Sequence, residues 1–168
     1  MRRIDAISAA ALLGLSLALG GCSYRPLYAT PENGVGVTAQ LSQVSVAEQK
    51  SRAGQLVRNE LMSGFNGGTD GSLLLKMAPA EKTQGVSSLA FEKTERHRYR
   101  LTIAYELVDV RTGEALTKGT SFSNVPYDTV EEPVADLRAA ESARERAARE
   151  VAQDLRLRLA SFLSTRNS

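Results

Sequence analysis

The sequence predicts an α+β fold: a two-layer sandwich with a sheet of about four mostly antiparallel strands and two helices packed on one face. Two stretches, one early and one at the end of the mature chain, repeat apolar residues every fourth position, as amphipathic helices do. The runs between them alternate apolar and polar residues, as strands with one buried face do. Because each helix has a single apolar stripe, we expect both helices to cover the same sheet face and leave the other face free.

The N-terminal segment predicts an exported, lipid-modified protein. Cys22 is the single cysteine of the 168 residues, and it closes a short, largely uncharged run behind two arginines, in the segment Leu19-Gly20-Gly21-Cys22. The run is shorter than the roughly 20 apolar residues that span a bilayer, and small residues before the cysteine suit a cleaved lipoprotein signal peptide. We predict a signal peptide over residues 1–21. The alternatives are an ordinary secreted protein cut nearby, or a buried apolar helix with an incidental cysteine.

The predicted modification is an N-acyl chain and an S-diacylglycerol group on Cys22, with no other cofactor. Each buried methylene contributes about 0.8 kcal/mol, so two or three chains hold a protein at a membrane much more firmly than one. Ser23 follows the cysteine, and by resemblance to enterobacterial sorting rules this residue favours the outer membrane.

Residues 22–34 are predicted to form a lipidated tether, because two prolines and Asn33-Gly34 favour an extended or turning path. Residues 35–168 are predicted to form a single domain, which is long enough to bury a core without disulfides. Its first element is predicted to be a half-buried strand over residues 35–46, where apolar and polar side chains alternate.

A helix is predicted to begin at the capping box formed by Ser45 and Glu48. Its apolar residues recur every fourth position and form one stripe: Ala53, Val57, Leu61 and Phe65. The segment Asn66-Gly67-Gly68 is predicted to end this helix.

Strands are predicted over residues 73–78, 86–93, 99–110 and 114–125, the last two joined by a hairpin turn at Asp109–Gly113. The clearest alternation lies between His97 and Leu107, where the apolar set is Tyr99, Leu101, Ile103, Tyr105 and Leu107. A long helix is predicted from about Glu132 to Leu163, with Pro133 tolerated in its first turn. Its apolar stripe consists of Ala143, Ala147, Val151, Leu155 and Leu159.

Several function classes are disfavoured by composition. Loss of Arg2, Arg3 and Asp5 with the signal peptide leaves 19 basic and 18 acidic residues of the original 21 and 19, which is not a nucleic-acid-binding balance. His97 is the single histidine, and acylation would consume the single thiol, so neither a metal ligand set nor a nucleophilic site is expected. The glycines after the first helix are predicted to form a turn, because a phosphate-binding loop would lie between a strand and a helix. An enzyme is therefore the disfavoured class.

Arg96, Arg98 and Arg100 are the most notable polar group. Their two-residue spacing places them on one strand face, and with nearby Lys93 they can bind phosphates, such as those of an anionic lipid head group. The alternative is an ordinary solvated face whose arginines pair with Glu92, Glu95 or Glu106.

The segment from Gly21 to Tyr28, which reads Gly-Cys-Ser-Tyr-Arg-Pro-Leu-Tyr, resembles the opening Gly-Cys-Gly-Phe-Arg-Pro-Leu-Tyr of the alphaproteobacterial LptE family of lipopolysaccharide-assembly lipoproteins. Similar too are Arg58-Asn59-Glu60-Leu61, the hairpin from Tyr105 to Gly113, and the run from Ala139 to Ala152. Pro126-Tyr127-Asp128 departs from the Ser-Tyr-Asn that the family often shows there.

This resemblance implies a two-helix, four-stranded sandwich that plugs the lumen of the outer-membrane β-barrel LptD. Such a plug supports barrel assembly and helps lipopolysaccharide reach the outer leaflet, from inside the lumen or from the periplasmic side. The lipid-attachment role carries over to Cys22. The rival hypothesis is a lipoprotein scaffold or pilot for another envelope assembly machine, without glycolipid binding.

Overall fold

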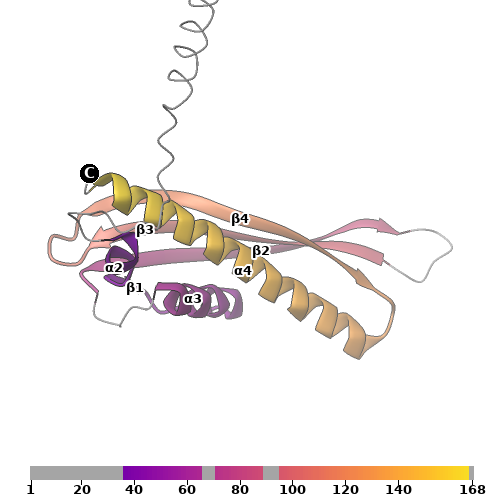
Figure 1. Cartoon of the computed structure of the whole chain (residues 1–168). Helices are drawn as coiled ribbons and strands as arrows, with labels where there is room; N and C mark the ends of the chain where they lie inside the picture. The colour runs from indigo at the N-terminus through magenta and orange to yellow at the C-terminus, as the bar shows by residue number, and fades with distance from the viewer. Residues whose placement is uncertain (1–35, 66–70, 89–94, 167–168) are drawn as a thin grey trace, which may run out of the picture.

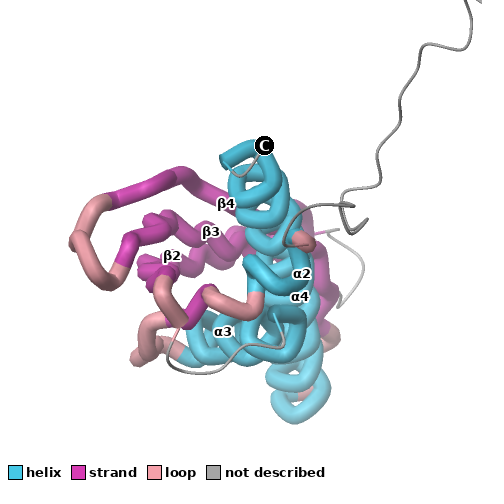
Figure 2. Tube along the Cα trace, turned by 60° about the vertical axis from the view of Figure 1, so that its left-hand side comes forward, coloured by secondary structure: helices cyan, strands magenta, loops and turns pink. Residues whose placement is uncertain are grey.

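The structure is a computed structural model that describes residues 36–65, 71–88 and 95–166, and for residues 86–88 it describes the backbone alone. It confirms the α+β fold, with one four-stranded sheet and helices gathered on one side of it (Figures 1 and 2). The elements are, in order, α2 (Val37–Leu41), β1 (Val44–Val46), α3 (Arg52–Phe65), β2 (Leu73–Ser88), β3 (Glu95–Asp109), β4 (Ala115–Thr129) and α4 (Pro133–Arg166).

The sheet is mixed, and its strands lie in the order β1-β2-β3-β4. The two pairs among β2, β3 and β4 are antiparallel, and they form a long twisted ribbon. The short strand β1 is parallel to β2 and pairs only with Leu73–Leu75. A parallel neighbour requires a crossover, which α3 supplies. Gly71 precedes β2, where a Cβ would lie 2.0 Å from the carbonyl oxygen of Gln43, so this close approach requires glycine.

The predicted strand over residues 35–46 is wrong for most of its length. Val37, Gln40 and Leu41 are buried at helical spacing in α2, and only Val44–Val46 forms a strand. An apolar alternation this short fits either structure, and here packing of Val37 and Leu41 into the core decides for the helix.

The predicted start of the first long helix at Ser45 is also wrong. Ser45 is a buried residue of β1, and its hydroxyl donates a 3.0 Å hydrogen bond to the carbonyl of Leu73. The helix α3 begins at Arg52, where the Ser51 hydroxyl oxygen caps it by accepting a 3.1 Å hydrogen bond from the backbone N–H of Gly54. The helix ends at Phe65, and the predicted terminating residues 66–68 lie outside the described residues.

The predicted strands over residues 73–78 and 86–93 are parts of a single strand up to Ser88, because β2 runs through Pro79 without interruption. The predicted hairpin turn is confirmed. The backbone N–H of Gly113 donates to the carbonyl of Asp109 at 2.8 Å, and Gly113 has φ +72°, a conformation that favours glycine. The Asp109 carboxylate accepts hydrogen bonds from the backbone N–H groups of Thr112 and Arg111, which lowers its pKa.

Prolines occupy both free edges of the sheet. In β2 the odd-numbered residues point their backbone groups away from β3, since Leu73 donates to Gln43 and Leu75 accepts from Ala47. Pro79 therefore lacks its N–H on the outer side, where β1 no longer covers the strand. The same alternation across β3 places the backbone groups of Pro126 on the outer side of β4. Proline is tolerated at such positions because no ladder hydrogen bond is lost.

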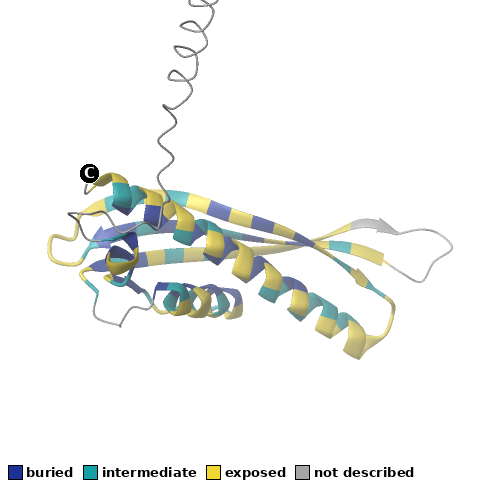
Figure 3. Ribbon diagram, in the orientation of Figure 1, coloured by how far each residue is buried: buried dark blue, intermediate teal, exposed yellow. Residues whose placement is uncertain are grey.

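The core lies between the sheet and the helix layer. The predicted stripes of both long helices and the predicted apolar set of β3 are all buried. Figure 3 shows buried and exposed residues alternating along the strands and helices. The helix α4 runs diagonally across the sheet, and its first turns extend past the buried region (Figures 1 and 3). In the described part of the chain, no helix combines the length and apolar character needed to cross a membrane.

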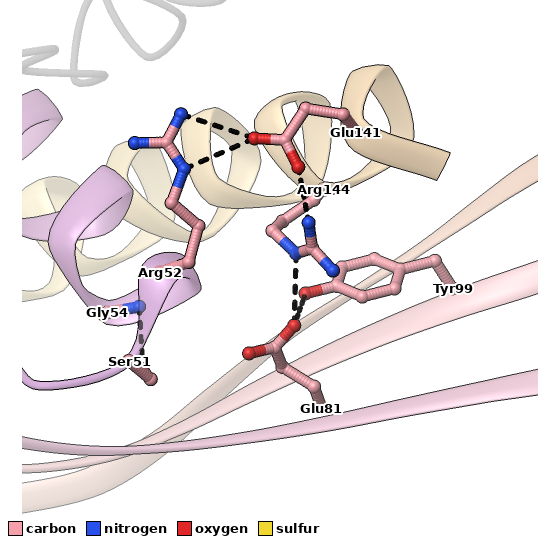
Figure 4. Close-up of polar contacts among 7 residues, drawn as sticks. All are labelled: Ser51, Arg52, Gly54, Glu81, Tyr99, Glu141 and Arg144. Carbon is pink, nitrogen blue, oxygen red and sulfur yellow. Dashed lines mark hydrogen bonds and ion pairs between the residues drawn. The ribbon is translucent and has the colours of Figure 1, made fainter. Parts of the chain in front are cut away.

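Polar contacts tie α4 to the sheet. The hydroxyls of Ser121 and Ser123 on β4 are buried and donate to the carboxylates of Asp154 (2.6 Å) and Glu150 (2.5 Å). A second group, shown in Figure 4, joins four elements. Arg144 of α4 pairs with Glu81 of β2 and with Glu141, Glu141 pairs with Arg52 of α3, and the hydroxyl of Tyr99 on β3 donates to Glu81 at 2.7 Å.

Candidate anion-binding face

The predicted arginines lie on the side of the sheet that no described helix covers. We call this side the open face, and it carries the even-numbered residues of β2 up to Gln84, of β3 before the bulge at Leu107/Val108, and of β4 from Lys118 onward. Arg96, Arg98 and Arg100 are all exposed there. The register places residues of β2 and β4 directly beside each of them, so their neighbours are known.

Arg96 is neutralised by its cross-strand neighbour. Its guanidinium forms two hydrogen bonds with the Asp128 carboxylate, at 2.9 and 3.3 Å. The hydrogen bond from Arg96 holds the pKa of Asp128 below its ordinary value. Arg96 therefore behaves as the solvated-face alternative expected, but its partner is Asp128 rather than a glutamate.

Arg98 and Arg100 have no ion pair with any carboxylate among the described residues. Arg98 lies opposite Gln84 and Pro126. Arg100 lies directly opposite Lys82, and its guanidinium sits 4.8 Å from the centre of the Phe122 ring. Like charges directly opposite each other destabilise a sheet, and a bound anion would relieve that repulsion. We call Lys82, Arg98 and Arg100 the cationic cluster.

Lys82 was absent from the sequence prediction, and Lys93 lies outside the described residues. Residue 82 lies between the predicted strands over residues 73–78 and 86–93, so the prediction placed it in a connection. The alternation of Lys76, Ala78, Ala80 and Lys82 would have placed it on the same face as Lys76 if the strand had been continued through Pro79.

The glutamates predicted as partners of the arginines lie elsewhere. Glu95 approaches His97 at 3.5 Å, and Glu106 lies opposite Lys76 and Lys118. Glu92 lies outside the described residues. None of the predicted glutamate partners in the described part of the chain forms an ion pair with the cationic cluster.

A shallow hollow of about 470 Å³ lies farther along the open face. Its side chains on this face belong to three adjacent strands: Lys76, Ala78, Ala104, Glu106, Lys118 and Thr120. The intervening residues Met77, Tyr105 and Gly119 also line it, and their side-chain positions belong to the helix-facing side, so they contribute backbone to its floor.

His97 lies on the opposite, helix-facing side of β3. Its ring stacks on Tyr127 with centroids 5.3 Å apart, and its Nε2 lies 3.2 Å from the Thr129 hydroxyl. His97 is thus packed and hydrogen-bonded near the end of the strand. Within the described ranges, no three His, Cys, Asp or Glu side chains are grouped as a metal site would require.

Comparison with known proteins identifies the family. The family model for LptE, described as lipopolysaccharide-assembly, matches residues 39–159, which is most of the chain. The chain belongs to the LptE family. The match covers β1 to β4, α3 and most of α4, so the family assignment rests on the folded domain and is independent of the N-terminal motif.

Two solved structures of lipoproteins are similar in fold. A candidate lipoprotein from Caulobacter crescentus is 25% identical, with a TM-score of 0.68, and the match covers 80% of this chain and 99% of that one. A minor lipoprotein from Acinetobacter baumannii shares the fold, at 10% identity and a TM-score of 0.54, over 70% of this chain and 88% of that one. No curated protein matched the chain.

Proposed function

We propose that this LptE-family chain is a noncatalytic outer-membrane lipoprotein, anchored by N-acyl and S-diacylglycerol lipid on Cys22. Its domain plugs and supports assembly of the LptD β-barrel and helps lipopolysaccharide enter the outer leaflet. Membership of the lipopolysaccharide-assembly family supports the role in glycolipid transport. The likeness to a candidate lipoprotein supports the lipid anchor.

The observation that carries direct glycolipid contact is the cationic cluster. Lys82, Arg98 and Arg100 are exposed on one face, and none has a carboxylate partner among the described residues. Arginine binds phosphate oxygens through charge-assisted, often bidentate hydrogen bonds. Each such bond contributes about 1.5–3 kcal/mol. Two arginines and a lysine on one flat surface therefore suit the phosphates of a lipopolysaccharide head group.

The test compares charge reversal inside and outside the cluster. We expect the double variant Arg98→Glu, Arg100→Glu to bind lipopolysaccharide at least tenfold more weakly, while it still copurifies with the barrel from envelope membranes. The matched control is Arg138→Glu, Arg149→Glu, which reverses two exposed charges on α4 and should bind normally. Affinity is measured on purified mature protein with labelled lipopolysaccharide.

Two results would contradict the proposal. Equal lipopolysaccharide binding by parent and cluster variant would return the arginines to a solvated-face role. Copurification of only other assembly factors, without a large β-barrel of the lipopolysaccharide pathway, would favour the scaffold hypothesis.

A further inference from the structure

The open face carries a second feature beside the cationic cluster, and the two lie along the same strands. The hollow is lined by three neighbouring rows of residues paired across β2, β3 and β4, and the row nearest the cationic cluster is Ala78, Ala104 and Thr120. Arg100 lies four residues from Ala104 on β3, a distance of about 13 Å along the strand. A single elongated ligand can therefore reach both features.

Small side chains give the hollow its depth and its chemistry. Ala78 and Ala104 leave the backbone accessible where longer polar side chains would normally cover an exposed sheet face. Lys76 and Lys118 flank one end and offer methylene stems along the surface, with their charged ends free to reach water. Phe122 does not line the hollow, but it lies two residues beyond Thr120 on β4, is 56% exposed and sits beside Arg100.

The surface between the methylene stems of the two lysines and Phe122 is thus mostly apolar, and the cationic cluster lies at its Phe122 end. A hollow of about 470 Å³ lies within the size range of small-molecule sites. A site that binds a saccharide needs several polar groups that point toward the ligand from different sides. Here the polar side chains Lys76, Glu106 and Lys118 lie in one row at one end, and the floor consists of alanine and backbone.

We propose that the hollow holds an acyl chain of an anionic amphiphile whose phosphate is bound by Lys82, Arg98 and Arg100. This inference rests on the proposed function and adds the orientation of the ligand. The head group lies toward the end of the sheet where β3 begins, and the acyl chain runs along β3 toward the Asp109–Gly113 turn. The charges at one end and the apolar strip beyond them match the two halves of such a molecule. A saccharide or a segment of the barrel in the hollow are the competing occupants.

The first experiment fills the hollow and varies the probe. We expect Ala104→Phe to weaken binding of lipid A at least tenfold, and to leave binding of the fully deacylated phosphodisaccharide unchanged. The control Ala115→Phe places the same ring at an exposed residue outside the hollow and should bind both probes normally. Unchanged lipid A binding by Ala104→Phe, or an equal loss of the deacylated probe, would overturn the inference.

The same measurement separates this inference from the function on which it rests. Arg98→Glu, Arg100→Glu should weaken both probes, because both carry phosphate. If that variant binds normally while Ala104→Phe loses lipid A, then the cationic cluster fails as the head-group site and the orientation is rejected.

The second experiment does not depend on a bulky substitution in the strand centre. A photoreactive phenylalanine derivative is placed at Thr120, an exposed residue of the hollow, in the full chain in intact cells. After irradiation and ester hydrolysis, mass spectrometry should find a fatty acid on the Thr120 peptide and none on the control position Gln153 of α4. A sugar-only adduct, a crosslink to a protein, or no crosslink at Thr120 would contradict the proposal.

Discussion

Tyr99 is a core residue of β3 whose hydroxyl belongs to one of the polar groups that join the sheet to α4. Only 4% of it is exposed, and its hydroxyl donates to Glu81, which also pairs with Arg144. Burial of the phenol raises its pKa well above the ordinary value of about 10, and the hydrogen bond to Glu81 adds to the shift. The raised pKa has a consequence for stability that can be measured.

We expect the contribution of Tyr99 to the free energy of unfolding to decrease at alkaline pH. Its folded pKa exceeds its unfolded pKa, so its contribution is complete below about pH 10 and is lost as the pH rises through the folded value. Tyr99→Phe should therefore lower the free energy of unfolding by about 1 kcal/mol at pH 8. The difference between parent and variant should shrink toward pH 11, measured by urea unfolding at each pH. A difference that stays constant across this range would contradict the assignment.

The sequence predicted which face of the sheet Tyr99 and the arginines of β3 occupy, but it did not predict their interaction partners. Alternation along β3 correctly placed Tyr99 toward the core and the arginines away from it, because a strand has a fixed two-residue period. The partners Glu81 and Asp128 lie on neighbouring strands, 18 and 32 residues away in sequence. Register between strands depends on the whole sheet, so no local pattern revealed that Arg96 is paired while Arg98 and Arg100 are not.

Among the elements, α4 packs closely because its stripe begins with alanines. Ala143, Ala147 and Ala148 are almost fully buried, and farther along the helix Glu150 and Asp154 accept hydrogen bonds from the buried serines of β4. Larger side chains at these positions have no space, since buried cores are close-packed.

Ala147→Leu should therefore destabilise the domain by about 1–3 kcal/mol, through overpacking between α4 and its neighbours. The measurement is urea unfolding at neutral pH. The matched control is Ser142→Leu, at an exposed position of the same helix, for which we expect little change. Equal effects of the two substitutions would show that helix propensity or surface polarity, rather than packing, limits this region.

Element boundaries were predicted well where a periodic pattern was long. The 34-residue helix α4 and the stripe of α3 followed from repeats over several turns. The early segment failed because residues 37–46 hold only a few apolar positions, which fit a strand or a helical turn equally well. The division of β2 into two strands was wrong because the chain continues in one strand through Pro79, which a free edge tolerates.

At the scale of the whole molecule, the projecting end of α4 exposes apolar side chains that the fold does not use. Val134 is 56% and Leu137 is 73% exposed, and they lie on one helix face three residues apart, after the exposed Val130. Grouped apolar residues on a surface often mark a protein contact. Under the proposed function, we infer that this end contacts the barrel.

Leu137→Asp should then reduce copurification of the barrel several-fold and leave the unfolding midpoint of the isolated chain unchanged, since the side chain is already exposed. Quantitative affinity purification from envelope membranes provides the readout. Leu157→Asp serves as the control, because Leu157 is 50% exposed on the same helix and lies 20 residues away. Normal barrel recovery with Leu137→Asp, or equal loss with both variants, would exclude a specific contact at this end.

Pro79, on the part of β2 that β1 does not cover, and Pro126, on the outer strand β4, affect whether another chain can extend the sheet. A second molecule that tried to extend the sheet at Pro79 or Pro126 would meet a missing donor and a bulky ring in the middle of the intended ladder. Lateral polymerisation is thereby discouraged on either flank. Contacts with other macromolecules would then use the open face and the projecting end of α4. This arrangement suits a domain that binds its partner as a single copy and does not form fibres.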